Sequence, residues 1–341
     1  MSFLLLESQK RRIYFIMSEF FKQESREIKA PVAETEKFFD FNEFGLHGEW
    51  LKITTTERKT VEGAYYKSEK SNGEMVIFHP GLPGDAVGTF EENFVKHLLD
   101  QGYDIFVARH NGLKNQKENE KLYHNKHRIE YDENISGQPM DWFNEPQVSI
   151  SFFAQQNKSI TLITHSFSGI LAANSFIEMN KNKEGQELVQ RVKKWILPSA
   201  SIWNMKGDNM LDIDRKLSIE DIRNYCDYFI KIYSIPLDIG SDQLLEEIKA
   251  ILNKIDTEIG KSIPENMEII GVYPENDKLV SPNIGINFVK KLPRGIILRD
   301  KHVPINNDED PHDFRSAQAV DLARIIKMKT SKSKHIFDIN K

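Results

Sequence analysis

The chain has 341 residues, enough for one large domain that buries a sizeable core, or for one domain with an insertion. Hydrophobic residues make up 39% and charged residues 28%, a composition that excludes collagen-like, coiled-coil and disordered classes. The formal net charge of −5 gives no global basic footprint for nucleic acid. The single cysteine, Cys226, excludes an intrachain disulfide framework and a cysteine-based zinc cluster.

Residues 1–45 mix charged and aromatic side chains without a clear period, and we interpret them as an N-terminal extension with a linker or turn at 30–33. The apolar run at 1–6 is too short to span a membrane. The basic residues at 10–12 follow it, whereas a signal peptide has them first. We therefore expect a cytoplasmic protein without stable membrane insertion.

From residue 46 the pattern is typical of a sheet with helices. Segments 50–57 and 61–67 alternate apolar and polar residues, which predicts two half-exposed antiparallel strands. Short continuous apolar runs then alternate with helical spacing, which predicts a mostly parallel sheet, buried on both faces, of α/β class. The predicted strands are 75–78, 103–109, 160–164, 195–197, 267–272 and 295–298, and the main predicted helices are 90–99, 167–177 and 312–327.

Two segments interrupt this alternation. Residues 112–138 are polar and predict a solvated loop or insertion. Residues 199–266 hold two predicted helices, no strand pattern and an apolar stripe at helical spacing, which includes Leu244, Ile248, Ile251 and Ile255. We expect this insertion to form a helical lid. The core then comprises 46–198 and 267–328, followed by a solvated basic tail at 329–341.

The segment Thr164-His165-Ser166-Phe167-Ser168 lies where the apolar run 160–164 meets a helix rich in small residues. A serine in a sharp strand-to-helix turn needs small residues two positions away on each side, because bulky ones would clash. Thr164 and Ser168 occupy those positions, where glycine is usual. Ser166 is therefore the candidate nucleophile, and the alternative is that it only caps the helix.

A serine hydroxyl is a poor nucleophile at neutral pH, so it needs a base, and the base needs an orienting carboxylate. Asp277 follows the apolar run 267–272 and is the candidate carboxylate, with a surface turn residue as the alternative. His302 follows the run 295–298 and is the candidate base. His312, at the start of the last predicted helix, is the alternative base.

The loop His79-Pro-Gly-Leu-Pro-Gly84 follows the apolar run 75–78 directly. Acyl transfer needs two backbone N–H groups that point at the developing oxyanion. We expect one from Leu82 in this loop and the other from Phe167, the residue after the nucleophile. These two residues are the candidate oxyanion hole.

Together these motifs resemble the α/β-hydrolase family over about residues 48–328. The resemblance implies the α/β-hydrolase fold, a lid within 199–266, and a serine hydrolase that cleaves a carboxylic ester or thioester through an acyl-enzyme. It implies no metal and no organic cofactor. The departures from the family pattern are Thr164, Ser168 and the turn Arg109-His-Asn-Gly112.

Two other functions remain open at this point. The same serine could serve an acyltransferase or a lyase, or the fold could be a binding module without turnover. For an enzyme, we expect a small-molecule acyl substrate with an apolar part and no nucleic-acid partner. Neither the exact substrate nor the oligomeric state has a recognisable pattern in the sequence.

Overall fold

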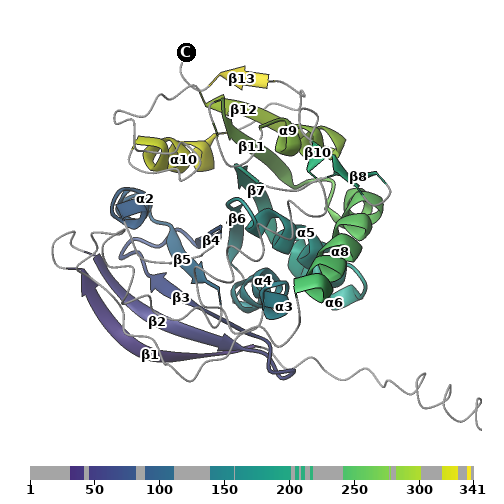
Figure 1. Cartoon of the computed structure of the whole chain (residues 1–341). Coiled ribbons are helices and arrows are strands. Elements are labelled where there is room, and N and C mark those ends of the chain that lie inside the picture. The colour runs from purple at the N-terminus through teal and green to yellow at the C-terminus, as the bar shows by residue number, and fades with distance from the viewer. Residues whose placement is uncertain are drawn as a thin grey trace, which may run out of the picture. The chain divides into compact units, whose positions relative to one another are not determined.

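A ten-stranded sheet forms the centre of the protein (Figure 1), in the order β1-β2-β3-β5-β4-β6-β7-β11-β12-β13. The computed structural model describes residues 31–41, 46–81, 89–110, 139–156, 158–200, 204–206, 209–211, 216–217, 241–275, 277, 282–300, 317–328 and 336–338. The strands are β1 (Val32–Phe41), β2 (Leu46–Thr54), β3 (Thr60–Tyr66), β4 (Glu74–His79), β5 (Asp104–Arg109), β6 (Ser159–Thr164), β7 (Val192–Pro198), β11 (Glu268–Pro274), β12 (Gly295–Asp300) and β13 (Ile336–Asp338).

The pairing changes from antiparallel to parallel along this sheet. β1, β2, β3 and β5 pair antiparallel in succession, and every pairing from β5 through β4 to β13 is parallel. All six residues of β5 are buried, as are all but the first of β4, because helices cover both faces. This burial explains the continuous apolar runs, and it confirms the predicted mostly parallel α/β sheet.

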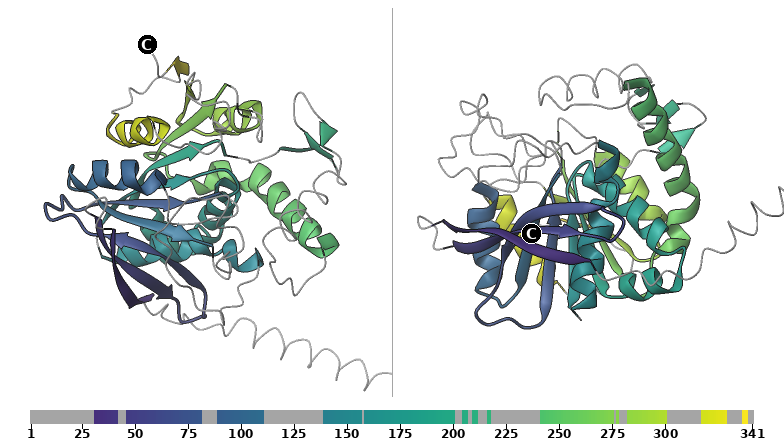
Figure 2. Two further views of the ribbon diagram at one scale, coloured as in Figure 1. Left: turned by 60° about the vertical axis from the view of Figure 1, so that its left-hand side comes forward. Right: turned by 90° about the horizontal axis from the view of Figure 1, so that it is seen from below.

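Helices line both faces of the sheet, as Figure 2 shows. Buried side chains of α2 and α10 pack in one core cluster, and those of α4, α5, α8 and α9 pack in the other. None of the described helices combines the length and the apolar character that a membrane span requires. The helices are α2 (Thr89–Leu99), α3 (Pro139–Trp142), α4 (Glu145–Gln155), α5 (Ser168–Met179), α6 (Lys183–Val189), α8 (Ser241–Ser262), α9 (Pro282–Lys291) and α10 (Ala317–Lys327).

Both edges of the sheet extend beyond the predicted strands. Residues 32–41, which we expected to begin as a linker, form β1 along β2. Residues 336–338, expected in a solvated tail, form β13 beside β12. Both expectations were wrong because an edge strand is defined by pairing with a distant segment, and neither stretch carries a clear period-two pattern.

The segment 199–266 contains strands as well as a helix. β8 (Asn204–Lys206), β9 (Asn209–Leu211) and β10 (Lys216–Leu217) form a separate three-stranded antiparallel sheet. The expectation of no strands here was wrong, because strands of two or three residues are too short to show alternation. The predicted loop at 112–138 and the second predicted helix of this segment lie outside the described residues.

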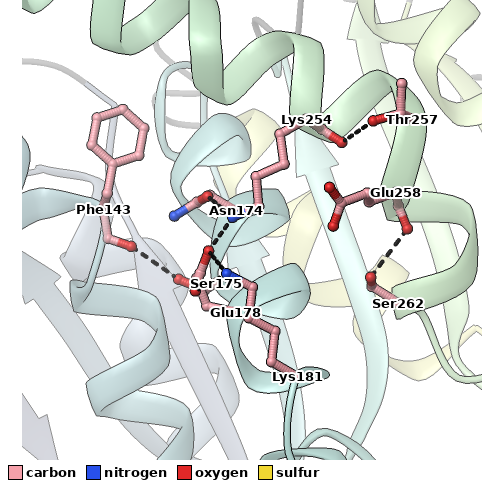
Figure 3. A network of polar contacts seen from close by, with 9 residues as sticks. All are labelled: Phe143, Asn174, Ser175, Glu178, Lys181, Lys254, Thr257, Glu258 and Ser262. Atoms are coloured by element: carbon pink, nitrogen blue, oxygen red, sulfur yellow. Dashed lines mark hydrogen bonds and ion pairs between the residues drawn. The ribbon is translucent and has the colours of Figure 1, made fainter. Parts of the chain in front are cut away.

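α8 packs on α5 at the side of the sheet. Its buried residues Ile248, Leu252 and Ile255 belong to the core, in agreement with the apolar stripe in the sequence. Lys254 also joins the two helices by polar contacts. Its Nζ donates to Asn174 Oδ1 at 3.2 Å and to Glu178 Oε1, both on α5 (Figure 3). α8, which lies between β7 and β11 in the sequence, is therefore part of the folded core.

Candidate active site

Ser166 occupies the sharp turn between β6 and α5. Its φ of +50° lies in the left-handed region, which costs a residue other than glycine about 1–3 kcal/mol. Its backbone N–H donates to Pro198 O at 3.1 Å, which ties the turn to the end of β7. The N-cap residue of α5 is Phe167, so the geometry does not support the alternative in which Ser166 serves as the helix cap.

The two residues that replace glycine around the serine both use their hydroxyl groups. Thr164 Oγ1 accepts a hydrogen bond from Trp195 Nε1 at 2.8 Å, in a place where both residues are fully buried. Ser168 Oγ donates to Pro80 O, in the loop that follows β4. The larger side chains are therefore accommodated, and they tether the turn to β7 and to that loop.

The loop after β4 approaches the serine closely. A Cβ added to Gly81 would lie 2.7 Å from Ser166 Cβ and 3.4 Å from Ser166 Oγ. The backbone N–H of His165 donates to His79 O at 3.0 Å, which continues the pairing of β4 and β6 beyond the strands. Only glycine fits at position 81 without displacing its neighbours, so the backbone at Gly81 lies next to the candidate nucleophile.

Of the two predicted oxyanion donors, only Phe167 lies within the described residues. Phe167 is described, at the start of α5, where its ring makes an edge contact with Phe143 at a centroid distance of 6.1 Å. Leu82 lies outside the described residues, so the pair stays a prediction.

Asp277 lies just past the end of β11, and Ser199 lies just past the end of β7, the neighbouring strand. Ser199 Oγ donates to Asp277 Oδ2 at 2.7 Å. Ser199 is fully buried and has a φ of +44°, and its N–H donates to Val272 O at 2.9 Å. Because Pro198 O accepts from Ser166 N–H, the dipeptide Pro198-Ser199 links the candidate nucleophile to the candidate carboxylate. Asp277 is thus a half-buried, hydrogen-bonded residue rather than a free turn residue.

His302 and His312 both lie outside the described residues, so the choice between them stays a prediction. β12 pairs in parallel with β11, with Asp300 opposite Pro274. The chain thus leaves the sheet at Asp300, two residues before His302 and beside the strand that leads to Asp277.

A buried polar cluster lies behind the loop after β4. His79 Nε2 contacts Ser149 Oγ at 2.9 Å, and His110 Nδ1 contacts Glu145 Oε2 at 2.7 Å, with both partners of the second pair fully buried. Burial, and secondarily the nearby His110, lowers the pKa of His79 to about 3. His79 therefore stays neutral at ordinary pH and anchors the start of the loop to α4. Within the described ranges, no three or more His, Cys, Asp or Glu side chains are grouped as metal ligands would be.

Ser199 and the cluster around His79 were not predicted from the sequence. A usable signal existed for Ser199, because it directly follows a buried strand that ends in proline, and Asp277 comes shortly after the neighbouring strand, which also ends in proline. Polar residues after parallel strands gather at one edge of the sheet. His79 is the first residue of the loop 79–84 identified in the sequence. Its partner Ser149, however, lies on α4, a helix that the sequence pattern did not predict.

The parallel sheet with its crossover helices, together with the strained serine between β6 and α5, defines an α/β-hydrolase fold. The predicted fold is confirmed on these features of the chain itself. The site lies at the carboxyl ends of the strands, where open α/β sheets place their ligands.

Comparisons with known proteins found structural likeness only. No protein-family model matches the chain, and no curated protein matches it in sequence. Among solved structures, acetyl xylan esterase 1 from a Thermoanaerobacterium species is similar, with a TM-score of 0.48 and 12% identity over 85% of this chain and 89% of its own. The esterase domain of a Rhodothermus marinus protein has a TM-score of 0.44 and 12% identity, over 81% of this chain and 94% of its own. The α/β hydrolase GrgF from a Penicillium species has a TM-score of 0.46 and 15% identity, over 73% and 88% respectively.

Proposed function

We propose that the protein is a serine hydrolase that cleaves a carboxylic ester or thioester through an acyl-enzyme on Ser166. The observation that supports this most strongly is the left-handed backbone of Ser166, set against Gly81 and linked through Pro198-Ser199 to the Asp277 carboxylate. A strained serine at the carboxyl edge of the sheet is costly to maintain. Such strain is concentrated at functional sites.

The reaction proceeds in two balanced steps. Ser166 Oγ bonds to the carbonyl carbon of the substrate while its proton passes to His302; the bond to the leaving oxygen or sulfur then breaks, and His302 protonates the departing alcohol or thiol. In the second step a water molecule gives its proton to His302 and its oxygen to the acyl carbon. The bond to Ser166 Oγ breaks, Ser166 recovers the proton, and the carboxylic acid leaves.

Three further groups assist these steps. Asp277 orients the imidazole of His302 and stabilises its charged form. The backbone N–H groups of Leu82 and Phe167 stabilise the negative charge that develops on the carbonyl oxygen. One such donor contributes on the order of 10²–10³ in turnover. None of these steps requires a metal or an organic cofactor.

Covalent labelling tests the nucleophile. A fluorophosphonate should modify the wild-type protein at Ser166, as mapped by peptide mass spectrometry, and Ser166→Ala should lose both the label and ester hydrolysis. Ser175→Ala is the matched control, because Ser175 is a buried serine of α5 that hydrogen-bonds Phe143 O at 3.2 Å, away from the turn. It should label normally. Modification of a serine other than Ser166 would refute the assignment.

We further propose that the insertion at 199–266 acts as a lid and favours a small acyl substrate with an apolar part. The test leaves α8 in place because this helix packs into the core. Replacing 218–240 with a short Gly/Ser linker, with α8 retained, should leave a folded enzyme with a changed preference across a panel of esters of increasing chain length. An unchanged preference would contradict the lid function.

A further inference from the structure

We infer that Ser199 is a positioning residue for the reaction, whose hydroxyl holds the Asp277 carboxylate in the orientation that the catalytic histidine requires. The inference rests on the proposed function and adds a residue that acts on the reaction only through Asp277. Its basis is the hydrogen bond from Ser199 Oγ to Asp277 Oδ2, at 2.7 Å.

The backbone of Ser199 is held in place from two sides. Its N–H donates to Val272 O at 2.9 Å, which fixes the residue to β11, the strand that leads to Asp277. The preceding carbonyl, Pro198 O, accepts from Ser166 N–H at 3.1 Å. One short turn therefore contacts the nucleophile on one side and the carboxylate on the other.

The backbone conformation of Ser199 points to a function of its side chain. A φ of +44° favours glycine, which adopts it without steric cost, whereas serine is strained there. Glycine lacks the one group that makes the contact with Asp277. Ser199 is also fully buried, so its hydroxyl is withdrawn from bulk water and directed to a single acceptor.

A carboxylate that orients a catalytic histidine must present one oxygen to the imidazole. The hydroxyl of Ser199 donates to Oδ2 of Asp277, and this hydrogen bond limits the orientations that the carboxylate can take. Asp277 stands at the start of a loop, just beyond β11, where the strand itself no longer restricts rotation of its side chain. The Ser199 hydrogen bond supplies this restriction, in the way that outer-sphere partners orient functional groups elsewhere.

The test separates the hydroxyl from the backbone conformation. Ser199→Ala removes the hydroxyl and keeps the strain, and Ser199→Gly removes both. With 4-nitrophenyl butyrate, both variants should lower kcat about 10- to 100-fold, the effect of one lost hydrogen bond to a charged group, with KM changed less than about 3-fold. Ser199→Gly should unfold at a higher temperature than Ser199→Ala, because both lose the hydrogen bond and only glycine relieves the left-handed strain.

A double-mutant cycle tests whether Ser199 acts through Asp277. Adding Ser199→Ala to Asp277→Ala should lower the residual kcat no further than Asp277→Ala alone, because the hydroxyl then has no carboxylate to orient. Ser175→Ala, which removes a buried serine hydroxyl elsewhere, should leave kcat unchanged.

Two results would overturn the inference while leaving the proposed function intact: wild-type kcat in Ser199→Gly, or independent, multiplicative losses in the double variant. In both cases the proposed function still holds if the wild-type enzyme turns over the ester and is labelled at Ser166 by a fluorophosphonate. If the wild-type protein shows neither turnover nor label, the proposed function fails, and the inference fails with it.

Discussion

Replacing Gly81 with alanine should impair catalysis while leaving the protein folded. The new Cβ would lie 2.7 Å from Ser166 Cβ, and an ordinary contact begins at 3.4 Å, so the loop or the serine must move by about 0.7 Å. A misplacement of about 1 Å at a reacting centre can cost on the order of 10² in rate. We therefore expect kcat/KM for 4-nitrophenyl butyrate to fall about 10- to 100-fold, with a loss of about 1–3 kcal/mol in the free energy of unfolding from overpacking.

The matched control is Gly260→Ala. Gly260 is an exposed residue of α8, and a Cβ added there meets nothing within 4 Å. Because alanine favours a helix over glycine by up to about 1 kcal/mol, this variant should be slightly more stable and fully active. Steady-state kinetics and urea unfolding measure both quantities. Wild-type kcat/KM in Gly81→Ala, with intact folding, would refute the close approach of this loop to the nucleophile.

Three further predictions concern single side chains. Thr164→Val should lower the free energy of unfolding by about 1–3 kcal/mol in urea, because Trp195 Nε1 loses its buried acceptor; a loss below about 0.5 kcal/mol would contradict that pairing. Because the pKa of His79 is lowered from 6.5 to about 3, the unfolded chain binds the proton more readily, so this residue should make stability fall as pH drops from about 6.5 towards 3. His79→Gln should flatten that slope in pH-dependent urea titrations, and an unchanged slope would assign it to other groups. His302→Ala should abolish ester hydrolysis whereas His312→Ala should mainly alter stability or substrate affinity, and the reverse result would exchange their roles.

The central strands and the serine turn were predictable from the sequence because their signals are local. β4 and β5 are buried on both faces, so each appears as a continuous apolar run, and β6 is buried over its last three residues. Ser166 comes two residues after β6 and precedes a helix, a junction that places it at the edge of the sheet. Ser166 has the left-handed backbone of a sharp strand-to-helix turn, and its function as a nucleophile stays a prediction.

Other parts of the fold and site depend on contacts that a local pattern does not record. α4 escaped prediction because residues 148–152 alternate apolar and polar residues as a strand does, and because Ser149 and Glu145 are buried polar residues with partners on other elements. The function proposed for Ser199 depends on its φ and on the adjacent end of β11, which comes beside it only once β7 and β11 pair. The edge strands β1 and β13 likewise depend on distant partners.

Trapping the acyl-enzyme tests the proposed function most directly. Rapid mixing with 4-nitrophenyl butyrate followed by an acid quench should give a burst of 4-nitrophenol that does not exceed one equivalent of enzyme. Peptide mass spectrometry of the quenched protein should place the butyryl group on Ser166, and Ser166→Ala should show neither burst nor adduct. Turnover that persists in Ser166→Ala, or a butyryl group on another residue, would contradict the assignment of Ser166 as the nucleophile.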